Sequence, residues 1–223
     1  KAQSGQAFIK WLVEENLNAR WNYDVEMIAA YFGEEEAVTP NVAGTEVGAM
    51  NGLKKIINDH ITDGSIVPVS MGLPPTAGTA NAEKELVDYC EELMKNTPTA
   101  LRKRPQNLVM SVEHEEMFRE GMRVKYNTYY RDEQADNTAS VLKLYTNRNV
   151  TISGQPAMGD SKKMWATLKE NAIHPVHDTE NPGWRFEDAD RSIKIFKDVM
   201  MWYGFWIPAY VTTNDVEHPA FES

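Results

Sequence analysis

The segment that decides the fold class covers residues 107–122 and reads NLVMSVEHEEMFREGM. Residues 107–110 form a short apolar run, which is typical of a buried strand. Ser111 then favours the start of a helix that runs to about residue 131. One face of this helix is apolar or aromatic and carries His114, Phe118, Met122, Tyr126 and Tyr129. A buried strand that leads directly into an amphipathic helix predicts a chain of the α+β class.

Three further helices are expected upstream of this segment. The first covers residues 6–32, and at 1.5 Å per residue it is about 40 Å long. The second covers residues 45–61, and the third covers residues 82–95 with Asn81 as its N-terminal cap. Gly33 ends the first helix, whose apolar stripe has spacings of three and four residues and consists of Leu17, Trp21, Val25, Ile28 and Phe32.

Short apolar runs bounded by turn residues predict strands in the second half of the chain. These strands cover residues 141–145, 149–153, 164–167, 172–174 and 193–196. The stretch at residues 199–211 predicts a hairpin that turns at Tyr203 and Gly204. Long loops are expected at residues 34–44, 65–80 and 132–140.

The chain is acidic, with 33 Asp or Glu against 23 Lys or Arg among its 223 residues and a net charge of −10. Such a chain is a poor general binder of nucleic acids, because phosphates are neutralised by clustered cations. The only basic cluster, Arg102-Lys103-Arg104, is interpreted as a solvated turn. The longest apolar run, residues 199–211, contains Gly204 and Pro208 and is too short to span a membrane.

The sequence contains none of the common catalytic, nucleotide-binding or metal-binding motifs, such as a Walker loop, a dinucleotide-binding glycine pattern, a nucleophile elbow or HExxH. His174, His177 and Asp178 could ligate Zn²⁺ or Fe²⁺, since imidazoles and carboxylates are metal ligands. Pro175 lies between the histidines and no third strong ligand is obvious, so a polar turn is the favoured interpretation. We therefore expect no metal and no cofactor.

Two other groups of residues have both a chemical and a structural interpretation. Glu113, Glu115 and Glu116 could perform acid–base chemistry beside His114, but carboxylates at a helix N-terminus more often interact with its dipole. Cys90, the single cysteine, could be a nucleophile, but its place on an apolar helix face favours a structural thiol. No catalytic residue is therefore expected.

Four apolar residues are candidates for contacts between subunits. Phe8 and Leu12 project nearly opposite the stripe of the first helix, so they need a second cover. Trp202 and Trp206 lie in an aromatic-rich stretch at residues 202–210. Such a stretch could stack on bases or sugars, but it more often forms core or subunit contacts.

Several segments, in their order along the chain, resemble the major capsid proteins of tailed phages, which share the Hong Kong 97 capsid fold. The segment YDVEMIAAYFG at residues 23–33 looks like the end of that family's long spine helix. Five other segments are similar to later parts of that fold. Residues 81–94 resemble a helix, residues 107–113 a buried strand with a second helix, and residues 149–156 (NVTISGQP) a strand with a Gly-x-Pro turn. Residues 165–173 (WATLKENAI) resemble a further strand, and residues 191–215 resemble the last strands.

The resemblance implies a Hong Kong 97-like fold with a long spine helix, a peripheral domain and an axial domain of mixed sheet flanked by helices. Residues 1–35 would form the spine helix of the peripheral domain, residues 36–194 the axial domain, and residues 195–223 the closing strands that return to the peripheral domain. The family's N-terminal arm and extended loop do not precede the helix here, so we expect the chain to be a fragment.

The resemblance also implies a function without catalysis, as the structural subunit of an icosahedral phage or prophage capsid shell that self-assembles into pentamers and hexamers. The partners would be copies of the chain, with scaffolding, portal and decoration proteins, and neither specific nucleic-acid binding nor a membrane is expected. The protein would reside in the virion capsid after assembly in the host cell cytoplasm. Two alternatives remain open: an encapsulin-like compartment shell, and a small metal-dependent enzyme that uses His174, His177 and Asp178.

Overall fold

The chain is of mixed α+β class and divides into two compact units. The first unit comprises residues 1–56 and 173–204, and the second comprises residues 57–172 and 205–223. The structure is a computed structural model that describes residues 11–37, 44–97, 102–126 and 141–168, a few single residues between these ranges, and the backbone of short strands from 172 to 212. The predicted domain boundaries at residues 35 and 194 stay a prediction.

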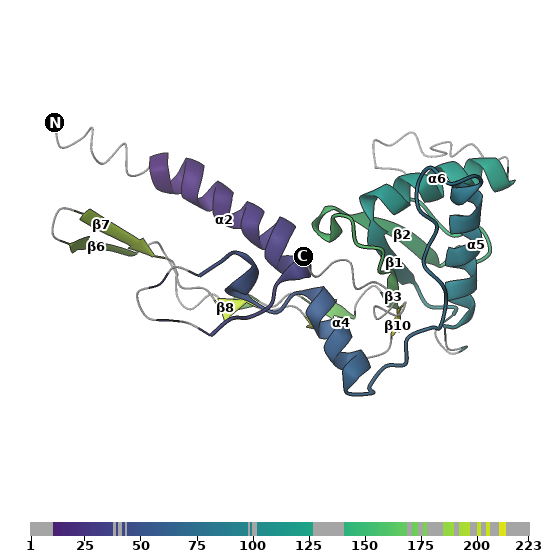
Figure 1. Ribbon diagram of the computed structural model, residues 1–223, viewed down its shortest axis with the longest axis horizontal. Helices are drawn as coiled ribbons and strands as arrows, with labels where there is room; N and C mark the ends of the chain where they lie inside the picture. Colours follow the sequence, from purple (N-terminus) through teal and green to yellow (C-terminus); the bar gives the residue numbers. More distant parts are fainter. Residues whose placement is uncertain are drawn as a thin grey trace. The chain divides into compact units, whose positions relative to one another are not determined.

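The first unit opens with a helical run over residues 11–32, which confirms the predicted helix where the chain is described. Two π-helical segments interrupt it, so that the order is η1 (Leu12–Leu17), α2 (Asn18–Asp24), η2 (Val25–Ala29) and α3 (Ala30–Phe32) (Figure 1). A π turn holds more residues than an α turn and therefore rotates the side chains that follow it. Of the predicted stripe only Val25 is buried, and Ala29 and Tyr31 are buried in place of Ile28 and Phe32.

The helical run ends where two glycines bring the backbone into close contact. Gly33 follows the helix as predicted, but with φ −57° rather than in the left-handed conformation. Its carbonyl oxygen accepts a hydrogen bond of 2.8 Å from the N–H of Gly52. A Cβ on Gly52 would lie 2.5 Å from the carbonyl oxygen of Tyr31. The absence of side chains on Gly33 and Gly52 therefore lets this segment pack against the helix end, where Met50 completes a small apolar cluster.

The helix predicted over residues 45–61 is only partly correct. A short 3-10 turn, η3 (Val47–Ala49), comes first, and α4 (Leu53–Thr62) forms a separate helix. Met50 between them is extended, with φ −164° and ψ 163°. The packing of Gly52 against Gly33 requires this extended link, and a tertiary contact therefore overrides the local helical pattern.

The second unit is built on a four-stranded sheet with the order β10-β3-β1-β2. Its strands are β1 (Gln106–Ser111), β2 (Val150–Gln155), β3 (Trp165–Leu168) and β10 (Tyr210–Thr212). The strands β1 and β2 are parallel, whereas β3 runs antiparallel to both β1 and β10. The predicted strand at residues 141–145 is reduced to one isolated bridge between Lys143 and Thr151. A 3-10 turn, η4 (Pro156–Met158), follows β2.

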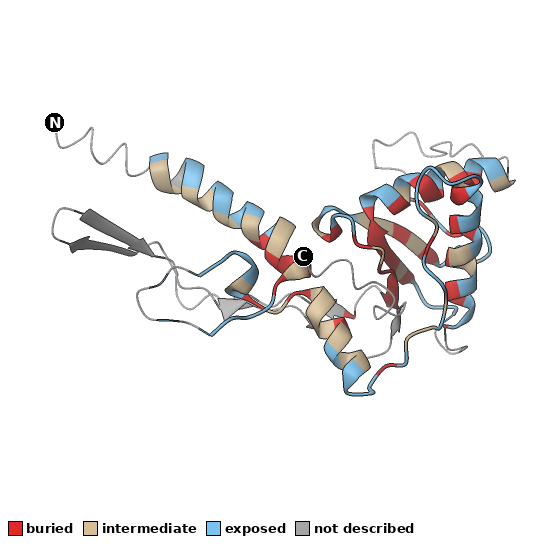
Figure 2. Ribbon diagram, in the orientation of Figure 1, coloured by how far each residue is buried: buried red, intermediate tan, exposed pale blue. Residues whose placement is uncertain are grey.

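Two helices, α5 (Ala82–Lys95) and α6 (Val112–Tyr126), pack together with this sheet (Figure 1). Leu108 and Met110 of β1 join the apolar faces of both helices in the main core of the unit. Figure 2 marks the buried residues in red along parts of both helices and along the strands of the sheet. Asn81 precedes α5 as predicted but in the left-handed conformation and without a side-chain cap, which corrects its expected role.

The predicted hairpin over residues 199–211 is wrong. Its segments are β8 (Met200–Met201), β9 (Gly204–Phe205) and β10, and each pairs with a different, distant strand. The partners of β8 and β9 are β5 (Val176–His177) and β4 (Ala172–Ile173). Just upstream, β6 (Arg185–Ala189) pairs antiparallel with β7 (Ser192–Phe196), with Ala189 opposite Ser192. The sequence analysis predicted only the second of these two strands.

Candidate functional site

A shallow groove runs along the solvent side of α5 in the second unit. Its lining comes from one face of the helix and from the loop that precedes it, and consists of Leu73, Pro75, Glu85, Asp88, Tyr89, Glu91, Glu92 and Lys95. The helix buries Leu86, Cys90 and Leu93 on its opposite face, so its charged residues are forced to the solvent side. The groove, called here the α5 groove, therefore combines an apolar edge with four carboxylates and one ammonium group.

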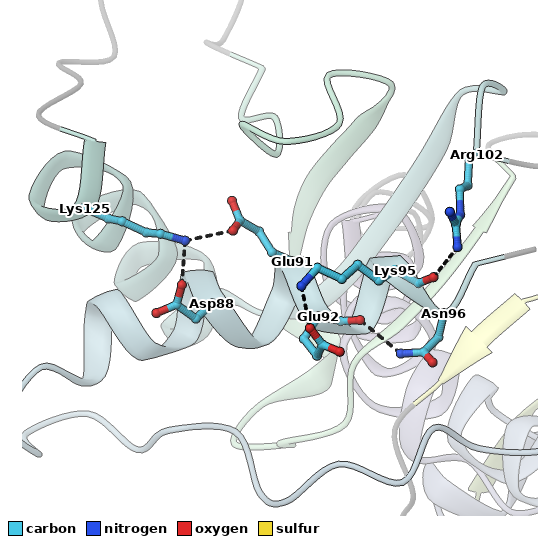
Figure 3. Close-up of polar contacts among 7 residues, drawn as sticks. All are labelled: Asp88, Glu91, Glu92, Lys95, Asn96, Arg102 and Lys125. Atoms are coloured by element: carbon cyan, nitrogen blue, oxygen red, sulfur yellow. Dashed lines mark hydrogen bonds and ion pairs between the residues drawn. The ribbon is translucent and has the colours of Figure 1, made fainter. Parts of the chain in front are cut away.

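Lys125 of α6 holds two of these carboxylates in place (Figure 3). Its Nζ lies 2.6 Å from Asp88 Oδ1 and 2.8 Å from Glu91 Oε2, and the lysine side chain is 15% exposed. The Tyr126 hydroxyl donates a hydrogen bond of 2.6 Å to Glu91 Oε1. Burial lowers the pKa of Lys125, but its hydrogen bonds to Asp88 and Glu91 outweigh this effect and hold the pKa above the usual lysine value. This end of the groove is thus a fixed, charged structure.

The other end of the groove lies at the C-terminus of α5. Lys95 Nζ is 2.7 Å from Glu92 Oε2. Arg102 reaches back to the helix end, where its Nη2 donates to the Lys95 carbonyl oxygen at 2.5 Å and its Nε donates to the Thr97 carbonyl oxygen at 2.9 Å (Figure 3). A cation is favourable here, because the last carbonyl groups of a helix have no partner within the helix.

Cys90 and Glu115, for which the sequence left a chemical role open, have structural roles. Cys90 is fully buried, and burial together with the nearby charge of Glu91 raises the pKa of its thiol, so the reactive thiolate is disfavoured. Glu115 Oε2 accepts a hydrogen bond of 3.0 Å from the N–H of Gly154, and Glu115 also pairs with Arg119. The bond to Gly154 holds α6 against β2, whereas the pair with Arg119 lies within α6, so both contacts of Glu115 are structural.

His114 also serves the local structure of the second unit. It is 4% exposed, and its Nδ1 lies 2.7 Å from Ser111 Oγ in a hydrogen bond whose donor depends on the tautomer. Ser111 Oγ additionally accepts a hydrogen bond of 3.4 Å from the His114 N–H, which confirms Ser111 as the cap of α6. Both side chains are enclosed, so neither reaches a substrate in solution.

Most of the predicted site residues lie outside the described part of the chain. These are Phe8, His174, Asp178, Trp202 and Trp206. The backbone of His177 lies in β5, while Leu12 in η1 is half-buried. Among the described residues, no group of three or more His, Cys, Asp or Glu side chains is placed to hold a metal ion. Within the same residues, no helix has the length and apolar character needed to cross a membrane.

No protein-family model matches this sequence, and no curated protein is significantly similar to it. The sequence analysis missed the α5 groove as a site, although its acidic stripe could have been found. Glu85, Asp88 and Glu92 recur at spacings of three and four, which places them on one helix face. The contributions of Leu73 and Lys125 depend on tertiary packing and leave no local signal.

Proposed function

We propose that the chain is a structural subunit of an icosahedral viral capsid shell of the Hong Kong 97 kind, which assembles from copies of itself into pentamers and hexamers. The proposal takes the kind of shell from the sequence resemblance, and it has no catalytic step. Scaffolding, portal and decoration proteins would be further partners. The protein would assemble in the host cytoplasm and reside in the virion capsid.

The observation that supports the proposal best is the poor cover of the opening helical run. Among the residues of this run whose burial is described, the buried ones lie in its last turns, namely Val25, Ala29, Ala30 and Tyr31 (Figure 2). Trp11 and Tyr23 are each 52% exposed, and Leu12 is half-buried. A helix of this length draws its stability from packing rather than from propensity, so its uncovered apolar side chains favour contacts with other molecules.

Electron microscopy of the natural full-length protein tests this proposal. Closed shells, tubes or rings of five or six subunits are the expected result. Replacement of both exposed aromatics, Trp11→Ser with Tyr23→Ser, should reduce the fraction of assembled protein at least about tenfold, because apolar burial drives association. Val124→Ser changes a side chain that is 59% exposed in the second unit and is the matched control. A monomer or dimer at all concentrations would contradict the proposal.

A further inference from the structure

We propose that the α5 groove binds the basic loop at residues 102–104 of a second copy of this chain. The inference rests on the proposed function, because a shell subunit must bind copies of itself, and it names the two surfaces that meet. It is carried by the lining of the groove, by the opposite charges of the two surfaces, and by how the basic loop is held.

The groove suits a cationic partner with aliphatic stems. Glu85, Asp88, Glu91 and Glu92 line it together with the single cation Lys95. The side chain of Glu85 has no hydrogen-bond or ion-pair partner within the described residues, whereas the other three carboxylates are held by lysines. Along the same groove Leu73 is 51% exposed. The methylene stems of lysine and arginine can cover such apolar surface while their charged heads reach carboxylates.

The loop at residues 102–104 provides such cations in a fixed position. The hydrogen bonds of Arg102 to the end of α5 hold one side of the loop, and Asn147 Nδ2 donates a bond of 3.2 Å to the Arg102 carbonyl oxygen. Lys103 and Arg104 are exposed, and among the described residues neither has an ion-pair partner. Lys103 and Arg104 are thus two exposed cations without an ion-pair partner in the described part of the chain, on a loop that Arg102 holds in place, and the net charge of the chain is −10.

The geometry favours a second copy over the loop's own groove. Arg102 is anchored on the carbonyl groups of Lys95 and Thr97, at the end of α5, and none of the loop residues is among those that line the groove. The loop adjoins the end of the groove at Lys95 but is not part of its lining, so the loop of one copy can meet the groove of the next in a head-to-tail contact. Contacts of this type close into rings when the rotation between copies permits it.

A charge-exchange experiment on the full chain tests the proposal. The groove variant carries Glu85→Lys with Glu92→Lys, and the loop variant carries Lys103→Glu with Arg104→Glu. Sedimentation velocity at low salt should show that each variant associates at least about tenfold more weakly than the parent, since like charges then face each other. The variant with all four changes should recover the association, because the charges are complementary again. Association of the parent should weaken as salt is raised.

Control variants carry the same changes of charge away from both surfaces. Glu46→Lys with Glu116→Lys matches the groove variant, and Lys143→Glu repeats one charge change of the loop variant; all three residues are exposed. These controls should associate like the parent. Circular dichroism and thermal unfolding should show that every variant is folded, so that weaker association is not a consequence of misfolding.

The outcomes separate this inference from the proposed function. Shells that form equally well in the groove and loop variants would overturn the inference and leave the function intact. Association that follows the charge exchange but never yields shells or rings would support the inference and contradict the function. A parent chain that stays monomeric would overturn the inference, and so would a variant with all four changes whose association does not recover. The inference would also be overturned if the groove bound a basic segment of another protein and not the loop of a second copy.

Discussion

His114 places an imidazole in the interior of the second unit, and this gives the fold a pH dependence. Burial is the main cause that lowers the pKa of His114, and the charge of Lys162 adds to it, while that of Glu113 opposes it. The unfolded chain therefore binds a proton on this residue at a higher pH than the folded chain does. The contribution to stability is complete above the unfolded value of about 6.5 and is lost as the pH falls below it.

We expect the free energy of unfolding to decrease as the pH is lowered from about 7 to about 5.5, and His114→Gln to make this dependence flatter. One proton contributes at most about 1.4 kcal/mol per pH unit to the slope. Urea unfolding at a series of pH values measures it. His60, which lies outside this core at the end of α4, provides the control variant His60→Gln. An unchanged slope in His114→Gln would contradict the assignment.

Cys90 gives a second test at the scale of single residues. Because its thiol is buried and its pKa is raised, the native protein should not react with a thiol reagent until it unfolds. Cys90→Ser should destabilise the protein by about 1–3 kcal/mol, since a hydroxyl would be buried among apolar side chains. Cys90→Ala should cost less than Cys90→Ser. Rapid labelling of the native protein would show that the thiol is accessible.

At the scale of elements, Gly121 sets the distance between α5 and α6. A Cβ at this position would overlap the carbonyl oxygen of Glu83 and lie 2.8 Å from Val87 Cγ2. Glycine inside a helix ordinarily costs about 1 kcal/mol relative to alanine. The gain in propensity from Gly121→Ala should therefore be outweighed by the clash with α5.

We expect Gly121→Ala to lower the free energy of unfolding by about 1–3 kcal/mol. Gly72→Ala is the matched control, because a Cβ at Gly72 meets no atom within 4 Å. That variant should be neutral or slightly more stable, since alanine restricts the unfolded chain. Chemical denaturation of both variants decides the matter, and a stabilised Gly121→Ala would show that the helices can separate without cost.

The elements that could be predicted from the sequence are those with a regular local pattern. The helix predicted at residues 82–95 and the strand at residues 107–110 agree with α5 and β1, because their apolar spacing is unambiguous. The segment at residues 45–61 was mistaken for one helix because its packing against Gly33 is not visible locally. The hairpin at residues 199–211 failed for a related reason, since its strands pair with distant partners rather than with each other.

The candidate site shows the same division between local and distant information. The acidic face of α5 follows from residue spacing, whereas its neighbours Leu73 and Lys125 reach it only through the packing of the second unit. Local patterns thus identify which side chains lie on a surface, and the tertiary fold decides which of them act together.

At the scale of the whole molecule, the chain passes between its two units at residues 56, 172 and 204. The second unit is therefore completed only by a segment near the end of the sequence. Its strand β10 pairs with β3, with Tyr210 opposite Thr167, Val211 opposite Ala166 and Thr212 opposite Trp165. The buried strand β3 would become an edge strand without β10, and exposed edges promote association between sheets.

A chain that ends at residue 208 should consequently lose cooperative unfolding or aggregate, although it retains α5, α6 and the other three strands of the sheet. A chain that ends at residue 213 keeps β10 and is the matched control, expected to unfold within a few degrees of the parent. Thermal unfolding and light scattering distinguish the two. Equal stability of both truncated chains would mean that β10 contributes nothing to the sheet, and the second unit would then be complete without the last return of the chain.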